Sequence, residues 1–175
     1  MPDDKSQDAD RSRVVEWNDP KLSSRDAASI SGLDYLRQIQ NGRIPPPPIA
    51  RLVGYQISEI EFGRAVFELE PLECHYNPFA TVHGGILTTL LDTAMTAALL
   101  STLAVGSACS TLELKTNFIR PITTETGMLK CEGRLYYSGN RIATAEGRLT
   151  DSRQLLYAHG VSTCMIHSAA KTKGN

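Results

Sequence analysis

A histidine, two glycines and one aspartate are the residues of this chain whose types and spacing could do chemistry. His83, Gly84 and Gly85 open a long apolar segment, and Asp92 follows inside it. The first turn of a helix leaves backbone N–H groups without partners, and such donors can stabilise an oxyanion. A carboxylate among apolar residues is costly unless it has partners or a task. The pattern therefore predicts a hydrolytic site, with donors at the helix start and a base or nucleophile at Asp92.

The elements that position these residues follow from hydrophobic periodicity. The segment 84–103 is apolar on nearly all sides, which predicts a central helix buried by a sheet. Alternating and β-branched residues predict strands on both sides of it in the sequence, joined by short turns. The expected strands are 52–60, 64–72, 109–120, 127–138, 141–151 and 155–166. Consecutive strands with a single central helix favour an α+β fold, in which an antiparallel sheet wraps around that helix.

The chain divides into four parts. Residues 1–25 are rich in charge and poor in large apolar groups, so we expect a flexible tail. Residues 26–48 should hold an extra N-terminal helix, capped by Ser24 or Asp26 and ending near Asn41, and a stiff proline-rich connector. The apolar residues of this segment suggest that it covers the substrate pocket or the edge of a dimer. The main domain spans 49–168, and 169–175 form a second tail.

Composition excludes several functions. A net charge of −1 and the lack of a zinc-finger spacing or basic helix argue against nucleic acid. Asp92, in the middle of the most apolar segment, argues against a membrane span. The histidines and the four scattered cysteines show no metal-ligand spacing, so no metal and no cofactor are expected. Unpaired cysteines and an acidic N-terminus without an apolar stretch predict a cytoplasmic protein with reduced thiols.

Several motifs together resemble one known family, the hotdog-fold acyl-CoA thioesterases of the PaaI (phenylacetate-pathway) type. The similarity covers roughly residues 50–167. It rests on Asn77, the His83-Gly84-Gly85 start, Leu91-Asp92, the strand 110–121 and the hairpin 139–151. The resemblance implies hydrolysis of an acyl-CoA to a free acid and CoA. It also implies a homodimer or homotetramer with shared active sites, because in that family the carboxylate comes from across a dimer interface.

The resemblance assigns roles to individual residues. Asp92 would be the general base or the nucleophile, and the sequence does not separate the two. The Gly84 N–H would bind the thioester oxygen, with His83 and Asn77 in supporting roles; from the residues alone, each of these two could equally hold a loop or turn. A hydroxyl beside the carboxylate falls on Thr111 when counted back from Pro121. Counting forward from Asp92 gives Ser110 instead, and we prefer Thr111.

The CoA phosphates should meet basic residues and free backbone N–H groups at the pocket mouth. Candidates are Arg120, Ser138, Gly139, Asn140 and Arg141. Acyl preference should depend on packing around Tyr76, Phe79, Met95 and Leu99. Two other functions stay open at this point: an acyl-thioester hydratase or dehydratase that uses a His83–Asp92 pair, and a non-catalytic acyl-CoA-binding module.

Overall fold

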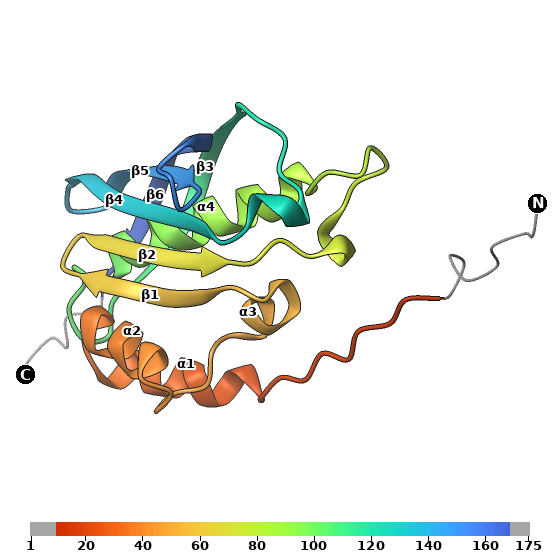
Figure 1. Cartoon of the computed structure of the whole chain (residues 1–175). Coiled ribbons are helices and arrows are strands. Elements are labelled where there is room, and N and C mark those ends of the chain that lie inside the picture. Colours follow the sequence, from red (N-terminus) through yellow and green to blue (C-terminus); the bar gives the residue numbers. More distant parts are fainter. Residues whose placement is uncertain (1–9, 169–175) are drawn as a thin grey trace, which may run out of the picture.

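The computed structural model describes residues 10–168, and its centre is a six-stranded antiparallel sheet curved around one long helix (Figure 1). The strand order is β1-β2-β4-β5-β6-β3, and each neighbouring pair is antiparallel. The strands are β1 Gln56–Glu61, β2 Arg64–Leu69, β3 Ala108–Phe118, β4 Leu129–Ser138, β5 Ile142–Thr150 and β6 Leu156–His167. The expected α+β architecture is thereby confirmed.

The central helix α4 spans Gly84–Leu100 and packs against the sheet. Its apolar residues leave no polar face, so most of the helix is buried. Three glycines form a row across β4, β5 and β6 beneath it: Gly133, Gly147 and Gly160. A Cβ at Gly133 would lie 2.2 Å from the carbonyl oxygen of Ala94. The missing side chains therefore let the sheet approach the helix backbone closely.

The N-terminal region differs from the expected single helix over 26–41. Helix α1 spans Pro20–Ser29, so it begins inside the segment expected to be a tail, and Ser24 and Asp26 lie within it. A second helix, α2, spans Gly32–Gln40 after a break at Ile30. Ser31 caps α2 by accepting a hydrogen bond from the Asp34 N–H. The tail predicted at 169–175 and the first nine residues lie outside the described part of the chain.

The proline-rich connector also contains structure that the periodicity missed. A short helix, α3, spans Pro48–Val53, so the strand expected at 52–60 begins only at Gln56. Proline is favoured at the first helical position, and the helix ends at Gly54, which has a φ of 93°. Two short 3₁₀ turns, η2 Glu73–His75 and η3 Thr124–Thr126, complete the connections.

The two edges of the sheet are β1 and β3. Strand β1 contacts α2, whereas the outer edge of β3 has no strand partner within residues 10–168. Strand β3 has 11 residues, which makes it a long unpaired edge of a kind that readily pairs with another strand.

No helix in the described range 10–168 is both long and apolar enough to cross a membrane.

Candidate active site

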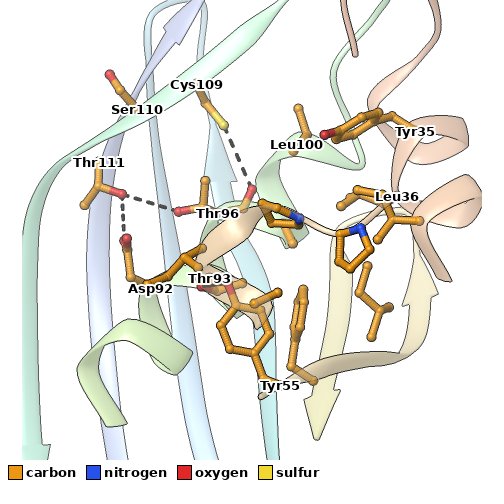
Figure 2. A pocket seen from close by; sticks show the side chains of 18 residues that line it. Tyr35, Leu36, Tyr55, Asp92, Thr93, Thr96, Leu100, Cys109, Ser110 and Thr111 are labelled. Atoms are coloured by element: carbon orange, nitrogen blue, oxygen red, sulfur yellow. Dashed lines mark hydrogen bonds between the residues drawn. The ribbon is translucent and has the colours of Figure 1, made fainter. Parts of the chain in front are cut away.

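The carboxylate of Asp92 lies half-buried on α4, facing the start of strand β3 (Figure 2). The Thr111 hydroxyl donates a hydrogen bond to Asp92 Oδ1 at 2.7 Å. The Thr96 hydroxyl lies 3.3 Å from that of Thr111. Thr111 therefore holds one carboxylate oxygen and leaves the other without a side-chain donor among the described residues.

The adjacent Ser110 points away from the carboxylate in Figure 2, and its hydroxyl lies 2.9 Å from His167 Nε2. Side chains alternate between the two faces of a strand, so only one of these two hydroxyls can face α4. The structure places Thr111 in that position.

Asp92 and Thr111 lie at one end of a largely apolar cavity of about 480 Å³. One wall comes from α4, where Asp92, Thr93, Thr96, Ala97 and Leu100 share a face at helical spacing. The opposite wall comes from the N-terminal region, with Tyr35, Leu36 and Ile39 of α2 followed by Pro46, Pro47, Ile49 and Ala50. The segment expected to cover the pocket or a dimer edge, residues 26–48, thus lines part of this cavity, and α3 extends this wall beyond residue 48.

The residues expected to size the acyl pocket are not the ones that line this cavity. Met95 and Leu99 are fully buried in the core, Phe79 is 85% exposed, and the Tyr76 hydroxyl contacts Thr124. The helical spacing of residues 92, 93, 96, 97 and 100 was the signal that could have identified the α4 wall. The N-terminal wall depends on tertiary packing and left no such signal.

Tyr55 adds a buried aromatic ring to the cavity. Burial raises the pKa of its phenol, a hydrogen bond from Thr93 at 3.4 Å opposes this, and the nearby Asp92 charge adds to the rise. Phe67 packs edge-on against the Tyr55 ring, with centroids 5.6 Å apart. The Tyr55 phenol is therefore a neutral part of the pocket at physiological pH.

Cys109 also lines the cavity, and burial raises the pKa of its thiol to about 11, with smaller contributions from Cys164 and Asp92. Since the thiolate is the reactive form, a neutral thiol is a poor nucleophile. Among residues 10–168 no group of three or more His, Cys, Asp or Glu side chains is placed to hold a metal ion.

The start of α4 forms the second cluster of expected site residues. The Gly84 N–H has no acceptor within residues 10–168, and Gly84 borders a separate cavity of about 330 Å³. A Cβ at Gly84 would lie 2.9 Å from Cζ of Phe118, so the ring covers this position closely. The helix start thus presents a free donor in the positive field of the helix dipole.

The other two expected residues of this cluster, His83 and Asn77, form hydrogen bonds with the neighbouring backbone and loop. His83 is the N-cap of α4, and its Nδ1 accepts a hydrogen bond from the Gly85 N–H at 2.8 Å. Asn77 accepts a bond from the Phe79 N–H at 2.8 Å and donates one to the Thr81 hydroxyl at 2.9 Å. Both side chains therefore hold the loop that leads into α4, the supporting role considered for each.

Within one chain the two clusters are far apart. Asp92 follows Gly84 by eight residues on the same helix, which corresponds to about 12 Å along the axis and about 80° around it. The separation from His83 is larger still, so one chain does not form the His83–Asp92 pair that a hydratase would use.

The candidate CoA-binding residues divide between the two ends of the sheet. Arg120 borders the same cavity as Gly84, and its guanidinium donates a hydrogen bond to the Leu156 carbonyl. Arg141 lies at the β4–β5 turn, beside the strand end that contains Thr111, because its carbonyl accepts from the N–H of Ile166.

That turn offers fewer free donors than expected. The Gly139 N–H donates to the Ile142 carbonyl at 2.9 Å and closes the hairpin, so it is not available to a phosphate. Ser138 and Asn140 are exposed beside it.

Comparison with known proteins agrees with this fold. A family model described as the thioesterase superfamily matches residues 79–158. A curated 1,4-dihydroxy-2-naphthoyl-CoA hydrolase of Listeria monocytogenes is 25% identical over 121 residues, which are 69% of this chain and 95% of that protein.

Solved structures give the same result. A phenylacetic acid degradation-related protein from Ralstonia eutropha is 29% identical, with 75% of this chain and 98% of that chain covered and a TM-score of 0.68. The PaaI protein of E. coli is 21% identical, with 77% and 95% covered and a TM-score of 0.67. Residues 79–158 of the chain therefore resemble the thioesterase superfamily, and the whole comparison indicates a thioester hydrolase with the PaaI-type hotdog fold.

Proposed function

We propose that this protein hydrolyses acyl-CoA thioesters to a free carboxylic acid and CoA, at active sites shared between two subunits. The observation that carries the proposal is the Asp92 carboxylate, held by Thr111 at the polar end of an apolar cavity. Such a cavity suits the acyl group. With the acyl group bound there, the thioester carbon would lie beside the Asp92 carboxylate. The Listeria relative, named as a CoA-thioester hydrolase, supports CoA as the leaving group.

Each subunit would supply half of the reacting centre. The Gly84 N–H of one subunit would donate to the thioester oxygen, and the partner subunit's Asp92 would approach the carbonyl carbon. As a general base, the carboxylate takes a proton from water while the water oxygen attacks that carbon. The resulting oxyanion is stabilised by the Gly84 N–H, and its collapse breaks the C–S bond and releases CoA, which receives the proton. As a nucleophile, the carboxylate attacks the same carbon and expels CoA as its thiolate, and water then cleaves the resulting anhydride to the free acid and the Asp92 carboxylate.

The free edge of β3 supports a dimer that completes these sites. Antiparallel pairing of β3 with a second copy would bring its N-terminal half, which includes Thr111, opposite the C-terminal half of the partner subunit's β3. That half ends at Phe118, whose ring lies beside Gly84. The pairing would therefore close much of the distance of about 12 Å that separates the two clusters within one chain.

The same dimer would place two arginines at one mouth. Arg120 would come from the subunit that supplies Gly84, and Arg141 from the subunit that supplies Asp92. Their positive charges, at opposite ends of the sheet in one chain, would then both be available to the phosphates of a single CoA.

The direct test is thiol release from a panel of acyl-CoAs by the wild type and by Asp92→Asn. Asparagine preserves the shape of the side chain but can neither accept the proton nor attack, so we expect kcat to fall by roughly a hundredfold or more. Circular dichroism and thermal unfolding would establish that the variant is folded. Equal rates for the two proteins would remove Asp92 from the mechanism, and no thiol release from any acyl-CoA by the wild type would refute the proposed reaction.

A further inference from the structure

The N-terminal part of the chain forms a wall of the apolar cavity, and this wall lies outside the segment that the thioesterase family model matches, 79–158. We call residues 35–50 the N-terminal wall. It faces α4 across the cavity, as Figure 2 shows for Tyr35 and Leu36 opposite Thr93 and Thr96. The size and chemistry of the cavity therefore depend on a segment that the shared family pattern does not specify.

The N-terminal wall is a fixed part of the fold. The Gly32 N–H, at the start of α2, donates to the Leu103 carbonyl at 3.1 Å, just past the end of α4. A Cβ at Gly32 would lie only 1.9 Å from the carbonyl oxygen of Leu100, so the two helices touch through their backbones there. Leu36 and Ala50 belong to the main hydrophobic core. These contacts fix the depth of the cavity and do not suggest a mobile lid.

The two ends of the cavity differ in polarity. Among the described residues that line the cavity, Asp92 alone carries a charge at neutral pH, and it lies at the reacting end with the threonines. The far end consists of apolar side chains and prolines from the N-terminal wall, together with the phenol of Tyr35. A charged group buried there would find no side chain of opposite charge among the described residues that line this end of the cavity, which is strongly unfavourable.

The volume of the cavity sets the size of the ligand. About 480 Å³ is within the range of roughly 300–1,000 Å³ that is typical of small-molecule sites. A two-carbon acetyl group would leave most of this space empty. A chain of about eight carbons could fill much more of it and bury its methylenes against the N-terminal wall.

We infer that the acyl group is uncharged, apolar and of medium length, and that the N-terminal wall selects it. This inference rests on the proposed hydrolysis of acyl-CoA. Each buried methylene should raise kcat/KM by about fourfold, so the six that distinguish octanoyl-CoA from acetyl-CoA give an upper bound of roughly 4,000-fold. Because some methylenes stay partly exposed to water, the real ratio is smaller. We expect kcat/KM for octanoyl-CoA to exceed that for acetyl-CoA by at least a hundredfold.

Three substrates and two matched variants test the inference. Acetyl-CoA and octanoyl-CoA differ in length, whereas octanoyl-CoA and suberoyl-CoA have the same number of acyl carbons and differ in a terminal carboxylate. Ile49→Trp adds bulk to the cavity from α3, and Leu52→Trp adds the same bulk on the same helix at an exposed residue that does not line it.

For the wild type, kcat/KM should be at least a hundredfold higher for octanoyl-CoA than for acetyl-CoA or suberoyl-CoA. Ile49→Trp should lower the value for octanoyl-CoA at least tenfold and change that for acetyl-CoA less than twofold, while Leu52→Trp should change neither. Equal hydrolysis of all three substrates by the wild type would overturn the inference but not the thioesterase. The inference would also be overturned if Ile49→Trp, like Leu52→Trp, left hydrolysis of octanoyl-CoA unchanged.

A binding measurement keeps the test independent of turnover. Calorimetry with 1-octanol, an uncharged chain of eight carbons, should show binding to the wild type and at least tenfold weaker binding to Ile49→Trp. If no acyl-CoA releases thiol, the proposed reaction fails, yet octanol binding that Ile49→Trp weakens would still support the apolar ligand class. No octanol binding to the wild type would overturn it.

Discussion

Replacing Gly84 by proline should remove one N–H donor and leave the start of α4 in place. Proline is favoured at the first helical position, and it restricts the residue before it to extended backbone. His83 already has that conformation, with φ −62° and ψ 134°. Because the Gly84 N–H has no acceptor within residues 10–168, no hydrogen bond of the described structure is lost. We therefore expect the variant to fold and to unfold at nearly the wild-type temperature.

The expected loss of activity follows from the lack of a substitute donor. Removal of one oxyanion donor lowers kcat by about 10²–10³ in other hydrolases. The next N–H, that of Gly85, cannot replace it, because it donates to His83 Nδ1 at 2.8 Å. We expect a loss of at least roughly a hundredfold in kcat. KM should change much less, because the donor acts on charge that develops in the transition state.

Gly84→Ala is the matched control. Alanine keeps the N–H but adds the same Cβ, which would lie 2.9 Å from Cζ of Phe118. The half-exposed ring can move, so Gly84→Ala measures the steric cost alone, and the difference between the two variants isolates the donor. Thiol release from octanoyl-CoA gives kcat, and thermal unfolding verifies the fold. If the two variants had the same kcat and the same Tm, the oxyanion role of Gly84 would be refuted.

Three further predictions concern the shared site. Co-expression of Asp92→Asn and Gly84→Pro chains should restore about a quarter of wild-type thiol release. Random pairing makes half of the dimers mixed, and each mixed dimer has one intact site out of two. If each site were complete within one chain, co-expression would restore no activity. Thr111→Val should lower kcat roughly tenfold to a hundredfold, since a hydrogen bond to a charged group contributes about 1.5–3 kcal/mol, and Thr111→Ser should recover most of it. Because its raised pKa of about 11 keeps Cys109 protonated at pH 8, iodoacetamide should label the exposed Cys74 and spare both Cys109 and activity, as peptide mass spectrometry would verify.

The regular elements were predictable because each carries a local signal. The apolar pattern and the Gly-Gly start located α4, which begins at Gly84 as expected and ends three residues before the expected Leu103. The strands from β3 to β6 lie within about two residues of their expected bounds. Alternation along a strand and an all-round apolar helix are both imposed by burial within a single element, so the sequence of that element suffices.

The errors occurred where competing local signals have opposite meanings. Prolines 45–48 indicate an extended connector, but Pro48 is also a good first residue of a helix, and α3 forms there. Ser31, followed three residues later by Asp34, is a helix start inside what looked like one continuous helix. The choice between Ser110 and Thr111 needed the pairing register, which has an irregularity between Thr111 and Glu113.

Two residues of the candidate site are close in the sequence but distant in space. Gly84 and Asp92 look like adjacent parts of one centre, but the rise of the helix separates them, so one chain presents the candidate carboxylate without the candidate oxyanion donor. The N-terminal wall lies on the Asp92 side of the chain. In a shared site, the base and the acyl pocket would therefore come from one subunit, and the oxyanion donor from the other.

This division predicts an asymmetry in mixed dimers. In a dimer of Gly84→Pro and Asp92→Asn chains, the single intact site uses the cavity of the Gly84→Pro chain, which keeps its own Asp92. Ile49→Trp added to that chain should lower octanoyl-CoA hydrolysis by the mixture at least tenfold, whereas the same change in the Asp92→Asn chain should leave it within twofold. Acetyl-CoA hydrolysis, measured in parallel, should respond to neither placement, because a short acyl group does not reach the N-terminal wall. Equal octanoyl-CoA rates for the two placements would show that pocket and carboxylate do not belong to the same chain, and the assignment of the cavity to the acyl group would fail with it.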